Sequence, residues 1–188
     1  EVVERPASAV KELVENAIDA GARRIEVTLG DGGRSLIRVV DDGGGMAPDD
    51  MALAVQRHAT SKLPGEDLLD VAFLGFRGEA LPSIASVSRL LLTSRIEGGD
   101  AWSLKVEGGA AGQPEPAAHP PGTRVEVRDL FYATPARLKF LKAARTEQTH
   151  AQDILTRLAM AWPGIGFVLH TDKRTPLRLA PEEGEAEA

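Results

Sequence analysis

The stretch "KELVENAIDAGA", residues 11–22, decides how the chain begins to fold. Its apolar side chains recur at helical spacing, so they share one face of a predicted helix. Pro6 suits the first helical turn, and Gly21 offers a C-terminal stop. We therefore expect an amphipathic helix that packs its apolar face against a core.

The polar side of this helix carries Glu12, Asn16 and Asp19, spaced i, i+4 and i+7. For an isolated helix, such a stripe is most simply a solvated face. Asparagine is nevertheless a mediocre residue inside a helix, and its amide oxygen is a ligand that magnesium accepts beside substrate phosphates. A carboxylate one turn away can polarise a water for attack on phosphorus. The helix alone leaves both interpretations open.

After this helix, the sequence predicts strands and helices in alternation, joined by mostly short connections. The first two predicted strands form a hairpin around "GDGG". The turn-rich run "GGAAGQPEPAAHPPG", residues 108–122, is expected to be a mobile connection. The predicted fold class is α+β, a two-layer sandwich of helices on a mixed, mostly antiparallel sheet. Strands are expected at residues 24–29, 35–42, 89–96, 101–108, 123–130, 166–171 and 176–180, and helices at residues 48–57, 78–86 and 135–161.

Composition narrows the function classes. The net charge is −6, from 22 basic and 28 acidic residues, which argues against a surface built throughout to neutralise nucleic acid. The absence of cysteine excludes disulfides, thiolate metal sites and a cysteine nucleophile. No apolar run approaches the roughly 18 residues of a membrane span, and no signal-peptide pattern occurs. We expect an intracellular, soluble protein without membrane contact.

Two glycine-rich segments are candidate ligand sites. In "VVDDGGGM", residues 39–46, a strand ends in two aspartates and three glycines. This is either a tight turn or a place where a ligand approaches the backbone and a carboxylate accepts from an exocyclic amine such as that of adenine. In "FLGFRGEALPSIAS", residues 73–86, glycines precede a helix, which suits either a phosphate site or a flexible loop. Neither a Walker A motif nor G-x-G-x-x-G occurs in the chain.

Five blocks occur in order over residues 1–141: "EVVERPASAVKELVENAIDAGA", "DDGGGM", "RHATSK", "GFRGEAL" and "GTRVEVRDLFYATPARLKFL". With them the chain resembles the N-terminal ATPase domain of MutL-type DNA mismatch-repair proteins. These belong to the GHKL superfamily, together with DNA gyrase B, the large heat-shock chaperone and histidine kinases. The resemblance implies the GHKL, or Bergerat, ATP-binding fold over residues 1–180, followed by an acidic flexible tail at residues 181–188.

The resemblance also implies roles for individual residues. Glu12 is expected to be the general base, and Asn16 the ligand of a magnesium ion that bridges the phosphates of ATP. Asp41 is expected to accept from the adenine amino group, and Thr123 to complete the base pocket. Other implied cofactor contacts are Gly43, Gly45 and Met46 in the glycine turn, Thr60, Ser61 and Lys62 beside the pocket, and Gly75, Phe76, Arg77, Gly78, Glu79 and Ala80 in a lid over the phosphates.

Two positions carry an alternative or a departure from the family pattern. For Lys62 the alternative is a solvated loop lysine. Asp42 stands where the pattern often has asparagine, which adds a negative charge near a polyanion. We expect a working site, because the Asp42 side chain need not face the phosphates.

The implied reaction is hydrolysis of ATP to ADP and phosphate with magnesium, and ATP would act as a conformational switch for dimerisation and partner coordination. Implied partners of the full-length homodimer are a MutS-type mismatch-recognition protein, other repair factors and non-specific DNA, in the bacterial cytoplasm and at the nucleoid during repair. For this chain we expect weak or absent hydrolysis and a monomer, because the N-terminal lid segment, the transducer domain and the dimerisation region would be missing. The alternatives are a nucleotide-sensing interaction module with negligible hydrolysis and a histidine-kinase type domain.

A basic cluster opens the last predicted long helix. Its members are Arg137, Lys139, Lys142 and Arg145. We interpret the cluster as ordinary helix solvation, with contacts to DNA phosphates as the alternative.

Overall fold

The computed structural model describes residues 3–56 and 79–183. The helices in these ranges are α1 (Pro6–Asp19), α2 (Pro48–Ala54), α4 (Ala80–Ser86), α5 (Pro135–Phe140) and α6 (Ala144–Ala161), with a 3₁₀ turn η1 (Asp31–Gly33). The strands are β1 (Arg24–Gly30), β2 (Leu36–Asp41), β3 (Arg89–Arg95), β4 (Ala101–Glu107), β5 (Ala110–Ala111), β6 (Glu115–Ala117), β7 (Gly122–Arg128), β8 (Gly166–His170) and β9 (Leu177–Leu179).

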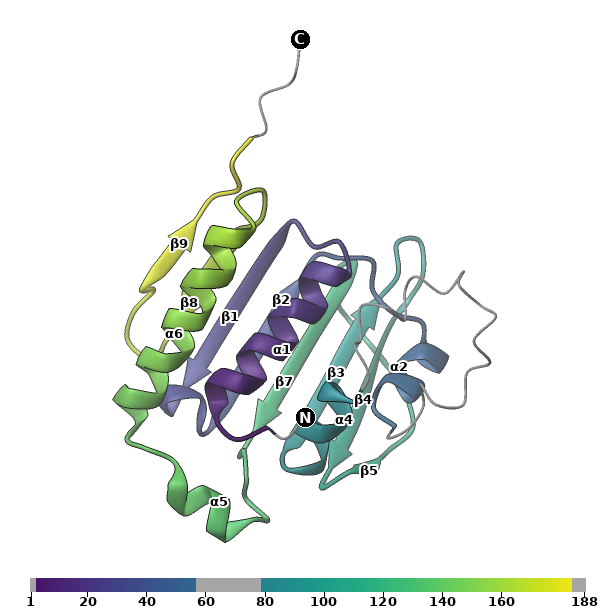
Figure 1. Ribbon diagram of the computed structural model, residues 1–188. Coiled ribbons are helices and arrows are strands. Elements are labelled where there is room, and N and C mark those ends of the chain that lie inside the picture. The colour runs from purple at the N-terminus through teal and green to yellow at the C-terminus, as the bar shows by residue number, and fades with distance from the viewer. Residues whose placement is uncertain (1–2, 57–78, 184–188) are drawn as a thin grey trace.

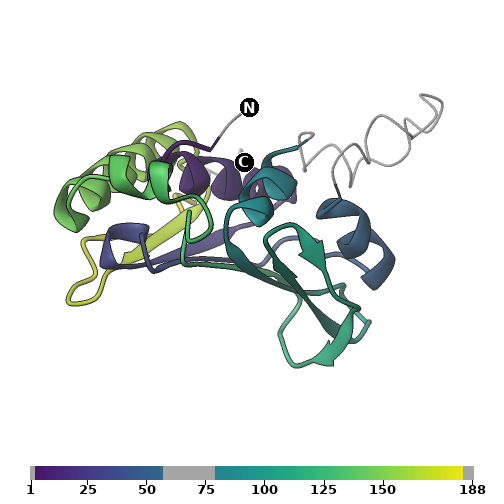
Figure 2. The same cartoon turned by 90° about the horizontal axis from the view of Figure 1, so that it is seen from below.

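The described strands form one nine-stranded sheet in the order β5-β4-β3-β7-β2-β1-β8-β9, and β6 also pairs with β4. Only the β1–β8 pair is parallel among them; the other pairs are antiparallel. Helices α1, α4 and α6 lie over one face of the sheet (Figure 1), and the turned view shows the two layers (Figure 2). The predicted α+β sandwich with a mixed, mostly antiparallel sheet is confirmed.

Helix α1 packs along the middle of the sheet, next to α6 (Figure 1). Pro6 occupies its first turn, and Gly21 follows it with φ +78°, as the sequence predicts. The apolar face is buried, but so is Asn16, whose exposed fraction is 7%. The prediction that the whole polar stripe lies opposite the core is therefore wrong for Asn16, which faces the space between α1 and the sheet.

The predicted long helix at residues 135–161 is two helices, α5 and α6, because the chain is extended between them. Leu141 has φ −67° and ψ 135°, and Ala143 has φ −56° and ψ 150°. The buried carboxylate of Glu147 accepts a hydrogen bond from the Lys142 amide at 3.1 Å. This bond satisfies a donor just ahead of α6, so the helix begins after the break. Helical periodicity does not reveal such a bond.

The predicted mobile connection at residues 108–122 contains β5 and β6, and both pair with β4. Without this segment, the backbone groups on the outer side of β4 would lack hydrogen-bond partners. The returning chain supplies those partners. Pro116 lies opposite Trp102 in this pairing, an edge position where a missing amide is tolerated. Pairing to the edge thus overrides the turn-rich composition.

The remaining predicted elements agree with the structure to within a few residues, although Arg57 and Gly78 lie outside the described residues. No helix in residues 3–56 and 79–183 is long and apolar enough to cross a membrane.

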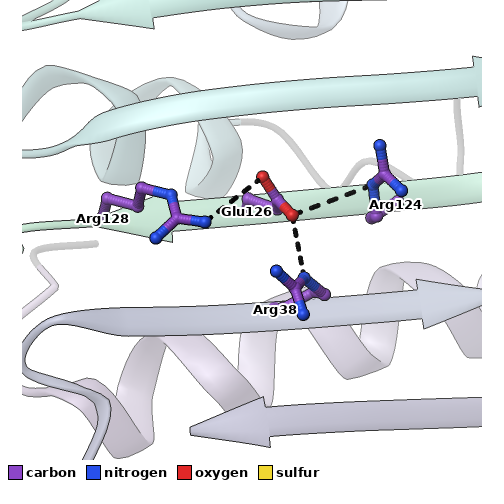
Figure 3. A network of polar contacts seen from close by, with 4 residues as sticks. All are labelled: Arg38, Arg124, Glu126 and Arg128. Atoms are coloured by element: carbon purple, nitrogen blue, oxygen red, sulfur yellow. Dashed lines mark hydrogen bonds and ion pairs between the residues drawn. The ribbon is translucent and has the colours of Figure 1, made fainter. Parts of the chain in front are cut away.

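A polar network lies on the face of the sheet opposite the helices, around Glu126 of β7 (Figure 3). Its carboxylate accepts from Arg38 Nε at 2.8 Å and lies 3.9 Å from nitrogens of Arg124 and Arg128. Glu126 is only 8% exposed, so these cations offset the free-energy cost of its burial. Within this network one carboxylate thus faces three guanidinium groups.

Gly45 lets the turn after β2 approach the end of β3 closely. Gly45 has φ +71°, and a Cβ there would lie 2.0 Å from the carbonyl oxygen of Arg95. Only glycine allows the two backbones to come so close. This contact holds the turn against the end of β3.

We expect Gly45→Ala to lower the free energy of unfolding by more than about 2 kcal/mol, because backbone strain and a backbone clash act together. Gly44→Ala is the matched control: its Cβ would meet nothing nearer than the Ala20 carbonyl oxygen, at 3.8 Å. Urea denaturation of both variants tests this. Equal denaturation midpoints would show that the close approach does not constrain the turn.

Candidate functional site

A narrow pocket lies between α1 and the ends of β2 and β7. Leu13 and Ala17 of α1 and Val39 of β2 contribute apolar surface, while Asn16, Asp41 and Thr123 contribute polar groups. Its cavity volume is about 20 Å³. Two roomier hollows of about 350 and 320 Å³ lie elsewhere, beside Pro181 and beside Phe140. Of these three hollows, which all lie in the described part of the chain, the small pocket is the one in which several buried polar groups converge on apolar walls, as in a small-molecule site.

Asp41 is the last residue of β2 and is 8% exposed. Its Oδ1 accepts a hydrogen bond from the Gly43 amide at 2.8 Å. Burial raises the pKa of this carboxyl to about 6, and the charge of Asp42 adds to the increase, while the amides of Gly43 and Thr123 oppose it. Near pH 7 the pocket therefore holds a mostly ionised, poorly hydrated acceptor.

Asp42, the residue after β2, points elsewhere. Its Oδ1 accepts from the amides of Arg23 and Arg24 at 2.8 and 2.9 Å. The side chain thus tethers the connection between α1 and β1. This geometry agrees with the expectation that Asp42 need not face a bound polyanion.

Asn16 and Glu12 come from the same face of α1. Asn16 lines the pocket, and Glu12 lies one helical turn earlier, partly buried and outside the described pocket wall. One turn separates their Cα atoms by about 6 Å along the helix axis. The two side chains can therefore act on neighbouring parts of one ligand.

The glycine turn has a structural reason for its composition. A Cβ at Gly43 would lie 2.8 Å from the Ala20 carbonyl oxygen, and the Gly44 amide donates to that oxygen at 3.0 Å. The turn is thus packed against the end of α1. Gly45 and Met46 line the pocket, and direct contact of Gly43 and Gly45 with a nucleotide stays a prediction.

Sequence reasoning missed Ser94, which is fully buried at the end of β3. Its hydroxyl accepts from the Met46 amide at 2.8 Å and lies 2.8 Å from Thr123 Oγ1 and 3.1 Å from the Gly122 carbonyl oxygen. Strand alternation could have revealed this residue. Leu90 and Leu92 face the core, so the next position on the same side of the strand, Ser94, is a polar residue at a core-facing position.

Two further predicted site residues lie in the described part of the chain but not in this pocket wall. Glu79 is the N-cap residue of α4, and Ala80 is the first residue of that helix. The others lie outside the described residues: Thr60, Ser61, Lys62, Gly75, Phe76, Arg77 and Gly78. The described part of the site thus brings together Asn16, Asp41, Gly45, Met46 and Thr123.

Comparison with known proteins identifies the fold and the family. Residues 4–111 match the family described as histidine kinase-, DNA gyrase B- and HSP90-like ATPase. The chain is 72% identical over 186 residues to the DNA mismatch repair protein MutL of Rhodospirillum rubrum, covering 98% of this chain and 30% of that protein. It is 62% identical over 178 residues to MutL of Azorhizobium caulinodans, covering 94% and 28%.

Solved structures agree with this match. The Aquifex aeolicus MutL ATPase domain complexed with ADP superimposes with a TM-score of 0.81 at 35% identity, covering 97% of this chain and 66% of that one. The chain spans about 30% of the length of its curated relatives. The chain therefore belongs to the histidine kinase-, DNA gyrase B- and HSP90-like ATPase family, in the branch of the MutL-type mismatch-repair proteins.

Proposed function

We propose that this chain binds ATP with magnesium in the pocket between α1 and β2, as the ATPase domain of a mismatch-repair protein. The observation that carries the proposal is the convergence of Asn16, Asp41 and Thr123 on one pocket with apolar walls. The similar Aquifex aeolicus ATPase domain is complexed with ADP, and this likeness supports nucleotide binding by the present chain.

The adenine ring suits the sheet end of the pocket. Asp41 is buried and ionised, and a bond from an exocyclic amine offsets the lost hydration of its carboxylate. Thr123 supplies a hydroxyl beside it, opposite Asp41 in the β2–β7 pairing. The apolar side chains of Leu13 and Val39 would contact the faces of a flat ring and exclude water.

The phosphates suit the helix side of the pocket. The Asn16 amide oxygen fits a magnesium ion that, when bound, neutralises charge on the phosphates, since such ions take few protein ligands beside phosphate oxygens. Glu12, one turn away, would hold the attacking water and take its proton. We propose contacts from the residues outside the described ranges as well: Thr60, Ser61, Lys62 and residues 75–78.

For the whole protein we propose that ATP drives homodimerisation and the coordination of a MutS-type partner, other repair factors and non-specific DNA in the bacterial cytoplasm. The similarity to MutL proteins over nearly the whole chain supports this. DNA phosphates have a candidate contact region at α5 and the start of α6, where the basic side chains are accessible to solvent: Arg137, Lys139, Lys142 and Arg145. This chain itself is proposed to be monomeric and to hydrolyse ATP weakly.

A nucleotide-sensing module with negligible hydrolysis would use the same pocket. Turnover and partner affinity separate the two functions when both are measured with ATP and with a non-hydrolysable analogue. Partner affinity that follows nucleotide binding while turnover is negligible would favour the sensing module.

The adenine acceptor is tested by Asp41→Asn, which keeps the side-chain shape but removes the charge. We expect the affinity for ATP to fall at least about tenfold in calorimetry, because a charge-assisted hydrogen bond is lost and an amide donor faces the adenine amine. Asp42→Asn is the matched control, since asparagine still offers an oxygen to the amides of Arg23 and Arg24. Unchanged binding by Asp41→Asn would exclude Asp41 as the adenine partner.

Binding should also depend on pH through Asp41. Its pKa of about 6 means that acidification from pH 7.5 to 5 protonates the carboxyl and weakens adenosine binding about tenfold. Adenosine is the ligand of choice because it has no phosphate to titrate. Adenosine affinity that is constant across this pH range would contradict the assignment.

The raised pKa of Asp41 also affects folding stability. Because its pKa is raised from 3.8, the ionised carboxylate lowers the free energy of unfolding above pH 6, and this penalty disappears as the pH falls toward 4.

Glu12→Ala should preserve ATP binding and abolish magnesium-dependent turnover, because the water loses its base while the pocket stays intact. Glu15→Ala is the control on the same helix, where Glu15 pairs with Lys11 at 3.8 Å. A sensitive phosphate-release assay at saturating ATP measures both variants. Wild-type turnover in Glu12→Ala would remove Glu12 from the mechanism.

A further inference from the structure

Three polar side chains form a row across neighbouring strands. Asp41 of β2 lies opposite Thr123 of β7, and Thr123 lies opposite Ser94 of β3. All three are buried, with exposed fractions of 8%, 5% and 0%. Asp41 and Thr123 line the pocket, and Ser94 lies behind Thr123.

The hydrogen bonds of Ser94 allow two directions for the hydroxyl protons. The Met46 amide can only donate, so Ser94 Oγ accepts from it at 2.8 Å. In one direction Thr123 donates to Ser94 at 2.8 Å and Ser94 donates to the Gly122 carbonyl oxygen at 3.1 Å; in the other, Ser94 donates to Thr123 Oγ1. A ligand acceptor in the pocket selects the second direction, because only then can Thr123 donate to the ligand while its oxygen accepts from Ser94.

This direction frees the proton of Thr123. Once Oγ1 accepts from Ser94, the Thr123 hydroxyl can donate into the pocket. The pocket then offers an acceptor, Asp41, beside a donor, Thr123. The Watson–Crick edge of adenine presents the complement, an amino donor beside the N1 acceptor. Guanine presents the reverse, an O6 acceptor beside an N1–H donor.

We propose that Ser94 is a specificity-determining positioning residue, which fixes the Thr123 hydroxyl as the donor to N1 of adenine. The inference rests on the proposed nucleotide function of the same pocket. Ser94 itself touches no nucleotide: it acts through Thr123, and it also holds Met46 and the glycine turn in place.

The test compares ADP with 1-deaza-ADP, in which a C–H group replaces N1 and the amino group is kept. Wild type should bind ADP about five- to tenfold more tightly than the analogue, the range expected for one neutral hydrogen bond. Ser94→Ala should lose that factor for ADP and keep its affinity for 1-deaza-ADP. Calorimetry at constant pH and magnesium measures the four affinities.

Three further variants separate positioning from packing. Ser88→Ala removes another fully buried serine hydroxyl, just before β3, which donates to the Ile84 carbonyl oxygen at 2.7 Å, away from the pocket. It should leave both affinities unchanged. Thr123→Val should bind the two ligands equally, and Ser94→Ala added to it should weaken ADP binding no further, because Ser94 acts through Thr123.

The outcomes are distinguishable. Ser94→Ala that weakens both ligands equally would reduce Ser94 to a structural role, and Ser94→Ala that weakens neither would remove it from the site. Either result overturns the inference and leaves the proposed function standing. A wild-type chain that binds neither ligand would overturn both.

Discussion

The pairing register of β2, β7 and β3 is the constraint on which the site depends. It places Asp41, Thr123 and Ser94 in one row and on the face that α1 covers. Side chains alternate along a strand, so a slip of one residue would turn the shifted side chain toward the opposite face. Apolar neighbours of the row, including Val125 and Leu92, also belong to the core. Burial of the core therefore holds the polar row in place.

Backbone contacts complete that arrangement. Gly45 lies against Arg95, and Gly122 lies against Asp41 so closely that a Cβ there would be 2.1 Å from the Asp41 carbonyl oxygen. The pocket is thus framed by main chain as well as by side chains. Main-chain atoms lose little conformational freedom when a ligand arrives, which favours a preorganised site.

Periodicity in the sequence was sufficient for α1, for the first hairpin and for the order of most elements along the chain. It failed at residues 141–143 and at β6, because both depend on contacts that periodicity does not encode: the carboxylate of Glu147 and the open edge of β4. At the candidate site, the sequence blocks pointed to Asn16, Asp41 and Thr123, which the fold brings to one pocket. They did not reveal Ser94, because its importance comes from three contacts that only the sheet brings together.

The short strands at the margins of the sheet have a consequence for how copies of the protein can meet. At one margin of the described sheet lie β5, which has two residues, and β6, which has three. At the other margin lies β9, which has three residues and is followed closely by Pro181. Such margins offer few consecutive free amides and carbonyls for strand addition. Polymerisation of the sheet from molecule to molecule is thereby discouraged, which protects a crowded cell from aggregates.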